Sequence, residues 1–156
     1  MITTPATDSE GAPAPRPLLM SLRPRFVQAI LDGSKTVELR RARVSAPPGT
    51  PIVLYASSPV MAVLGLATLA DRHTASPTTI WRKHRANVGI SRAEFLDYFA
   101  GATQATALTI ADPQPLAAPL TLALLRSHAE FQPPQSYRYI TTTDPAPLRE
   151  LTASLV

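Results

Sequence analysis

Large apolar residues occur in short runs that proline, glycine and serine interrupt. The runs cover residues 18–22 (LLMSL), 52–56 (IVLYA), 60–69 (VMAVLGLATL) and 105–111 (ATALTIA). Runs of this length between turn residues are typical of buried β-strands rather than of long helices. Gly65 lies inside the third run, where a glycine indicates a bulge or a sharp bend. The chain is therefore predicted to form a small, curved or closed sheet of short strands.

Helical patterns lie between and after these runs. Pro24 in a first turn, a one-sided apolar pattern and Gly33 at the end predict a helix over residues 24–32. Ser91 and Glu94 have the spacing of a capping box and predict a helix that stops at Gly101. The remaining elements are expected to be helices over residues 77–85, 120–126 and 146–154 and a strand over residues 136–140. This order predicts an α+β fold, a small β-barrel with helices packed at its rim.

The length of 156 residues fits one domain. Residues 1–16 are rich in proline, alanine, threonine and serine and predict a disordered tail, so the domain is assigned to residues 17–156. No apolar stretch approaches the ~18 residues that cross a membrane. The N-terminus lacks the basic start and apolar centre of a secretion signal, so we expect a cytoplasmic protein.

The residue types exclude several kinds of chemistry. The absence of cysteine excludes disulfides, thiolate metal sites and a cysteine nucleophile. The three histidines have no ligand spacing and are interpreted as surface or helix-end residues, so no metal site and no cofactor are predicted. The net charge is +4 and comes mostly from arginine, which suits phosphates and stacked bases. Abundant arginine, alanine and proline also reflect GC-rich coding, so this charge permits nucleic-acid binding without requiring it.

A polar pocket is predicted beside the glycine turn. Residues 35–41 alternate, with Val37 and Leu39 on one strand face. The polar side chains of the other face are Thr36, Glu38 and Arg40. The turn at Gly33 delivers Lys35 next to them, and a cation, a carboxylate and a guanidinium together suit a nucleotide or phosphate ligand. The alternative is an ordinary ion pair on a solvated strand face.

The same segment resembles a known family. Residues 33–40 read GSKTVELR, which resembles the G-x-K-x-x-E-x-R signature of the ASCH family, a branch of the PUA-like β-barrels. The helix before it, the later stretches 55–59 (YASSP) and 133–139 (PPQSYRY), and the Gly65 strand are also similar to that family. The resemblance covers roughly residues 18 to 140. It implies a barrel that binds RNA or modified nucleotides in a cleft beside the motif.

The resemblance implies two kinds of enzyme among the family's members. Some resemble ribonucleases, and others resemble hydrolases of acylated cytidine. The hydrolase branch uses the motif lysine, a threonine three residues later and a glutamate further downstream. Lys35 matches the lysine, but Glu38 stands at the threonine position and the glutamate falls near Val88. This departure puts the amidohydrolase activity in doubt.

These patterns define the candidate residues. The ligand-binding set is Arg23, Lys35, Thr36, Glu38, Arg40, Tyr55, Ser57, Ser58, Gln135, Ser136 and Tyr137. A second candidate surface for nucleic acid consists of Trp81, Arg82, Lys83 and Arg85. If the protein is an enzyme, Lys35 and Glu38 are the catalytic candidates. The alternative for the Trp81 surface is a core tryptophan on a solvated basic helix. The alternative for Tyr137 is that it fills the end of the barrel.

Three functions remain open at this stage. The leading hypothesis is a module that binds RNA or a nucleotide-like ligand, because no nucleophile–base pair is evident. The second is a ribonuclease or an amidohydrolase of a modified nucleoside. The third is a regulatory interaction domain without ligand chemistry. Oligomeric state and ligand identity are not determined by the sequence.

Overall fold

The computed structural model describes residues 16–153, and the tail expected over residues 1–16 lies outside this range except for Arg16. The described residues form six strands and five helices. In chain order these are β1 (Leu18–Leu22), α2 (Pro24–Leu31), β2 (Val37–Arg40), β3 (Pro51–Ala56), β4 (Ala62–Ala75), α3 (Pro77–His84), α4 (Arg92–Tyr98), β5 (Ala105–Thr121), α5 (Leu122–His128), β6 (Tyr137–Tyr139) and α6 (Ala146–Leu151). None of these helices is long and apolar enough to cross a membrane.

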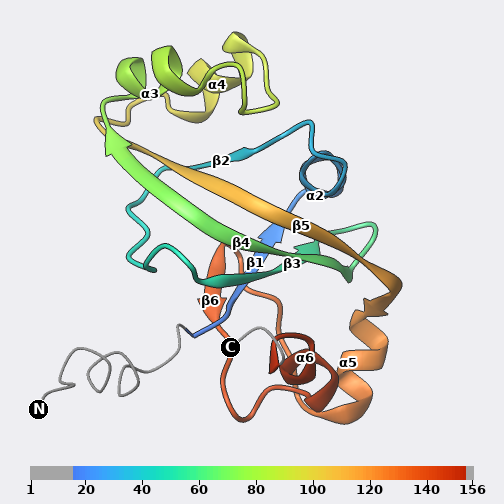
Figure 1. Cartoon of the computed structure of the whole chain (residues 1–156). Coiled ribbons are helices and arrows are strands. Elements are labelled where there is room, and N and C mark those ends of the chain that lie inside the picture. The colour runs from blue at the N-terminus through green and yellow to red at the C-terminus, as the bar shows by residue number, and fades with distance from the viewer. Residues whose placement is uncertain (1–15, 154–156) are drawn as a thin grey trace, which may run out of the picture.

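The strands form one mixed sheet in the order β2-β5-β4-β3-β1-β6. Only β1 and β3 pair in parallel; the other paired strands are antiparallel. The sheet curls around α2, while α3 and α4 cover the β2 end and α5 and α6 lie at the opposite end (Figure 1). The predicted α+β class, with a curved sheet and helices at its rim, is confirmed.

The curled sheet is a half-barrel rather than a barrel closed by backbone pairing. Its edge strands β2 and β6 are not neighbours in the hydrogen-bonded order of the described strands. The Arg40 side chain of β2 crosses between the edges instead: its Nη1 donates to Ser136 Oγ, just before β6, at 2.7 Å. We call this junction of Arg40, Ser136 and the adjacent Ser21 of β1 the seam.

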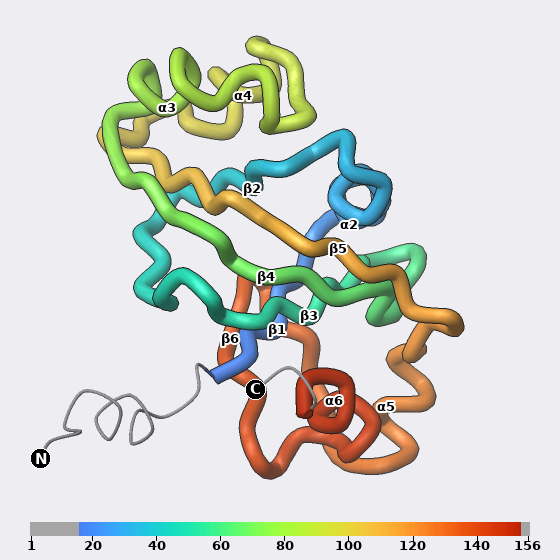
Figure 2. Tube along the Cα trace, viewed as in Figure 1, coloured from blue at the N-terminus to red at the C-terminus, as the bar shows by residue number. Residues whose placement is uncertain are grey.

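Two strands run much further than their apolar runs predict. β4 continues to Ala75 and β5 to Thr121, and together they form a long ribbon across the molecule (Figure 2). Residues 112–121 of β5 include three prolines, a residue that is disfavoured inside a sheet. β2 pairs only with residues 106–109 of β5, so the proline-rich half has a neighbour on one side alone. Proline is tolerated on such an edge because no ladder donor is lost.

Gly65 produces the predicted bulge. Pairing with β3 shifts between Leu54 and Tyr55, which oppose Gly65 and Val63 respectively. A Cβ atom on Gly65 would lie 2.5 Å from Leu31 Cδ2 and 2.8 Å from the Gln114 carbonyl oxygen. The missing side chain therefore lets α2 and β5 approach β4 closely.

The apolar side chains form three clusters. The interior of the half-barrel packs β-strand residues against Val27 and Ile30 of α2. A second cluster joins the outer face of β1 and β3 to α5 and α6 through Leu125 and Leu148. A third joins Val37 and Leu39 of β2 to α3 and α4. One face of β2 therefore packs in the third cluster, and Glu38 on the other face is also buried.

Candidate functional site

The end of α2 positions Lys35. The helix ends at Asp32, and Gly33 adopts φ of 86°, a left-handed conformation that glycine accepts without strain. Ser34 donates its backbone N–H to Asp32 Oδ1 at 2.8 Å, and the Lys35 N–H returns to the Ala29 carbonyl at 3.0 Å. This tight reversal places the lysine side chain under the helix, at the beginning of β2.

Three charged side chains form a chain from Lys35 to the seam. Lys35 Nζ lies 3.4 Å from Glu38 Oε1, and Arg40 Nη2 lies 3.2 Å from Glu38 Oε2. Their side chains are only 2%, 9% and 11% exposed, in the order Lys35, Glu38, Arg40. The predicted alternation of β2 is correct, but the solvated strand face offered as the alternative is wrong. We call these three residues the ion chain.

Lys35 is enclosed by its neighbours. Its Nζ donates to the carbonyl of Val88 and lies 4.9 Å from the centre of the Phe26 ring. Burial lowers the pKa of Lys35, and the attraction of the Glu38 carboxylate opposes this shift. Val88 stands near the position where the family resemblance places a downstream glutamate. It lies beside Lys35 but offers only its backbone carbonyl oxygen.

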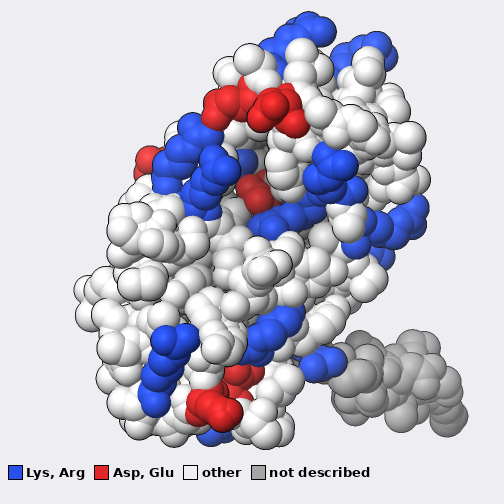
Figure 3. All heavy atoms as spheres, turned by 180° about the vertical axis from the view of Figure 1, so that it is seen from behind, with Lys and Arg blue, Asp and Glu red and all other residues white. Residues whose placement is uncertain are grey.

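A cleft of about 230 Å³ opens over Lys35 and Glu38 of the ion chain. The view in Figure 3 shows it as a hollow with a recessed acidic group between lysine and arginine side chains. Its lining residues come from α2 and its N-cap, β2, the α3–α4 connection and α4: Arg23, Arg25, Phe26, Lys35, Glu38, Leu39, Ile90, Glu94, Asp97 and Tyr98. The cleft is therefore mixed in charge, with cations on the α2 side and carboxylates on α4.

The α4 side of the cleft was missed by the sequence analysis. Glu94 accepts the Ser91 N–H in the predicted capping box and also pairs with Arg25 of α2. The ion pair with Arg25 is the largest of the interactions that lower the pKa of Glu94. Arg41 donates to the Tyr98 carbonyl at 2.7 Å and so ties the end of β2 to α4. The capping pattern located the helix, but nothing in it indicated which element the helix faces.

The remaining ligand-binding candidates are placed unevenly. Arg23 lines the cleft, and Ser136 contacts Arg40 at the seam. Tyr55 does not line the cleft; it is buried on the outer face of β3 in the second apolar cluster. Ser57 and Ser58 lie in the turn after β3, and Gln135 lies on an exposed loop. Thr36 is half-buried just before β2, and Tyr137 packs against the interior core.

The basic segment of α3 lies apart from the cleft. Trp81 is partly buried, and its ring centre lies 4.9 Å from that of Phe95 in the third apolar cluster. The exposed cations of the segment are Arg82, Lys83 and Arg85. This arrangement is the core tryptophan on a solvated basic helix that formed the structural alternative.

One histidine at a helix end is buried rather than on the surface. His84 ends α3 as expected, but it is buried, and its Nε2 lies 3.1 Å from His73 Nδ1 on β4. Burial, followed by His73 and Lys83, lowers the pKa of His84. Within residues 16–153 no group of three or more histidine, aspartate and glutamate side chains could hold a metal ion.

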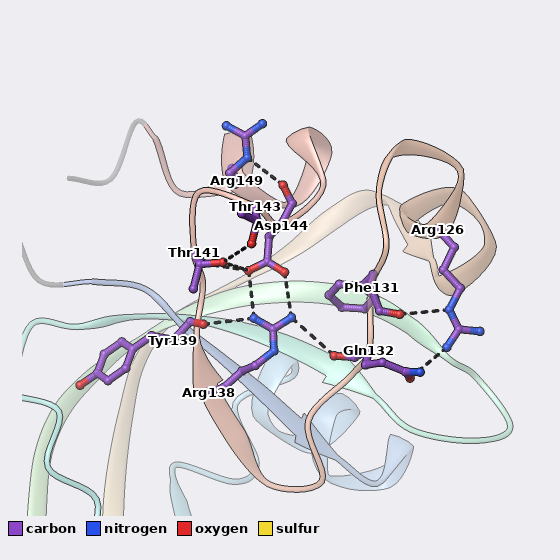
Figure 4. A network of polar contacts seen from close by, with 9 residues as sticks. All are labelled: Arg126, Phe131, Gln132, Arg138, Tyr139, Thr141, Thr143, Asp144 and Arg149. Carbon is purple, nitrogen blue, oxygen red and sulfur yellow. Dashed lines mark hydrogen bonds and ion pairs between the residues drawn. The ribbon is translucent and has the colours of Figure 1, made fainter.

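A second polar network organises the loop that follows β6. Arg138 of β6 forms a fork on Asp144, with nitrogen–oxygen distances of 2.9 and 2.8 Å (Figure 4). Asp144 also accepts the Thr141 N–H at 2.8 Å, and its carbonyl accepts from Arg149 Nε at 2.9 Å. These contacts, which we call the Asp144 network, were not predicted because they depend on the path of an irregular loop.

Comparisons with known proteins agree with this fold. No protein-family model matches the chain. The chain is 36% identical over 139 residues to the ASCH domain-containing ribonuclease of Zymomonas mobilis, covering 88% of this chain and 93% of that protein.

Two crystal structures from Zymomonas mobilis are similar throughout. A serine-to-alanine variant of its ASCH protein has 33% identity and a TM-score of 0.80, and it covers 90% of this chain and 99% of the other. A tyrosine-to-phenylalanine variant has 32% identity and the same TM-score, with coverage of 88% and 97%.

The curled mixed sheet, its rim helices and these neighbours define a PUA-like α+β protein. The chain belongs to the ASCH domain family, as the motif over residues 33–40 indicated.

Proposed function

We propose that this protein is a ribonuclease that binds single-stranded RNA across the cleft and the seam. The observation that carries the proposal is the Arg40–Ser136 contact, which connects the ion chain of the ASCH motif to the opposite edge of the sheet. The relative that is 36% identical is named a ribonuclease, and its similarity extends over nearly the whole of both chains. RNA is therefore the substrate class that these observations support best.

The pattern of substitutions in the Zymomonas structures supports the seam as the reactive region. Their substituted tyrosine and serine are separated by as many positions as Tyr55 and Ser136 in this chain. No other tyrosine followed by a serine in this sequence has that spacing. Tyr55 and Ser136 were candidates from the sequence, and they are the pair that we assign to the reaction.

The seam has the chemistry that a phosphodiester requires. The Arg40 guanidinium is always charged and can direct its N–H groups at phosphate oxygens, where negative charge builds up during cleavage. The exposed Ser136 hydroxyl is an additional donor beside it. Burial raises the pKa of Tyr55, while Arg126 opposes the shift, so the phenol stays protonated at neutral pH and serves as a donor rather than a base.

Binding without cleavage is the second candidate function. It is favoured by the burial of Lys35, whose ammonium group is engaged by Glu38 and by the Val88 carbonyl and is only 2% exposed. A lysine held in this way orients its carboxylate partner and adds positive potential to the cleft, which is enough for a binding module. An amidohydrolase is less well supported, because Val88 brings no carboxylate to the lysine.

The test measures binding and cleavage together. A labelled single-stranded RNA and an acylated cytidine are incubated with the wild type, Ser136→Ala and Tyr55→Phe, with Ser45→Ala as an exposed control. We expect cleavage of RNA alone, with Ser136→Ala and Tyr55→Phe slowed and the control unchanged. Binding of RNA without cleavage would favour the second candidate. A wild type that neither binds nor cleaves RNA would contradict the proposal.

A further inference from the structure

Three residues that carry hydroxyl groups lie side by side on neighbouring segments of the backbone. Ser21 of β1 is the parallel partner of Tyr55 on β3, and its N–H donates to the Ser136 carbonyl at 2.9 Å on the other side. Side chains alternate along a strand, and Leu19 of β1 and Val53 of β3 both face the second apolar cluster. Ser21 therefore shares the face of Tyr55, between it and Ser136.

The middle member of this row has unused hydrogen-bonding capacity. Ser21 Oγ is a buried atom without a partner among the described residues, and the same holds for Arg40 Nε. Both belong to the seam, where Arg40 Nη2 lies 3.4 Å from the Ser21 carbonyl. Buried polar groups nearly always have partners, so two donors at one junction that the fold does not pair are available to a ligand or to water.

The seam is accessible to a ligand. Ser136 is exposed and Ser21 is partly exposed as a residue, although its oxygen points inward. Rotation of Ser21 about its Cα–Cβ bond to another staggered position moves the hydroxyl without any backbone change. A guanidinium that retains a free N–H beside serine hydroxyls is suited to an anion with several oxygens.

We infer that Ser21 and Arg40 form a phosphodiester subsite at the seam, in which the Ser21 hydroxyl and Arg40 Nε contact one phosphate of the bound RNA. This inference rests on the proposed function and adds a residue that lies outside the ASCH motif. Ser21 contributes binding of the scissile or an adjacent phosphate. Tyr55 flanks it on β3, and Ser136 flanks it in the segment just before β6.

The test compares Ser21→Ala with Ser136→Ala and with Ser45→Ala, an exposed serine outside the row. Affinity for single-stranded RNA is measured by titration, and thermal stability is measured for each variant. Ser21→Ala should weaken RNA affinity by about tenfold or more, as expected for one hydrogen bond to a charged group. Its thermal stability should stay the same or rise, because the hydroxyl that it removes has no partner within the described fold.

The outcomes separate this inference from the function on which it rests. If Ser136→Ala weakens RNA binding but Ser21→Ala does not, the subsite is overturned while the proposed function stands. If the wild type does not bind RNA, both fall. If Ser21→Ala loses stability and its affinity falls only in proportion to the unfolded fraction, Ser21 is structural and the inference is again overturned. Added inorganic phosphate should compete with RNA less effectively in Ser21→Ala than in the wild type.

Discussion

The ion chain and the Asp144 network are built from the same kinds of charged side chain, but they serve different purposes. In the Asp144 network, the carboxylate receives both arms of Arg138 and the Thr141 N–H, so its acceptors are filled by the fold itself (Figure 4). In the ion chain, Arg40 contacts Glu38 and Ser136 but its Nε has no partner among the described residues. The comparison teaches that a completed network holds a loop, whereas an incomplete one beside a cleft is suited to a ligand.

The positions of the two networks agree with this difference. Asp144 lies in the loop between β6 and α6, where Arg149 Nε donates to its backbone carbonyl. The ion chain instead begins below a cleft of about 230 Å³ and ends at the exposed Ser136. Four predictions test the contrast, beginning with the largest expected effect.

Asp144→Asn should cause the largest loss of stability. It removes the charge opposite Arg138 and leaves the guanidinium only partly paired. The free energy of unfolding should fall by about 3 kcal/mol, at the low end for buried pairs because Arg138 is 32% exposed. Urea denaturation measures the loss, and Glu150→Gln on the exposed face of α6 is the control. A loss of unfolding free energy no larger than that of the control would contradict the structural role of the Asp144 network.

Lys35→Met should reduce the affinity for RNA more than it reduces the stability of the fold. The substitution keeps the volume of the side chain and leaves Glu38 paired with Arg40, while the cost of burying a charged lysine disappears. RNA affinity should fall about tenfold, because the cleft loses positive potential and Glu38 loses one of its two partners. The loss of stability should be smaller than in Asp144→Asn.

Lys83→Met, on the exposed α3 surface, is the matched control and should keep most of its affinity. If Lys35 takes part in catalysis, turnover of RNA should also be lost at saturating concentration. A loss of stability equal to that of Asp144→Asn, with RNA affinity unchanged, would mean that the ion chain is a second structural network.

Acid should weaken the fold in two steps. Because burial lowers the pKa of His84 below 6.5, the unfolded chain binds the proton first, and stability is lost as the pH falls from 6.5 towards the folded pKa. For Asp144, burial by itself raises the pKa. The hydrogen bonds from Arg138 and Thr141 lower the pKa by more than burial raises it, so the net pKa is below 3.8. The stability from Asp144 is therefore present above pH 3.8 and lost as the pH falls through the folded pKa.

The two steps can be separated with one variant. Denaturation midpoints measured across this pH range should show both losses in the wild type, whereas His84→Gln should retain only the one at lower pH. A His84→Gln profile identical to that of the wild type would show that the histidine pair has no part in acid stability.

The sequence predicted the local structure of the site better than its surroundings. The helix, the glycine turn at Gly33 and the alternation of β2 follow from local spacing, and they were correct. The contact of Arg40 with Ser136 joins segments far apart in the chain, and no local pattern encodes such a pairing. The partial burial of Trp81, the meeting of His73 with His84 and the α4 wall of the cleft likewise depend on packing between elements.

The most direct test of the central claim is the salt dependence of RNA affinity in two arginine variants. Arg40→Gln should reduce the slope of log affinity against log salt by about 0.7, the contribution of one phosphate contact on a single strand. Arg149→Gln, in the Asp144 network, should keep the wild-type slope. This pair of slopes would show that the seam binds phosphate and that the structural network does not. An unchanged slope in Arg40→Gln, or an equal reduction in both variants, would contradict the account.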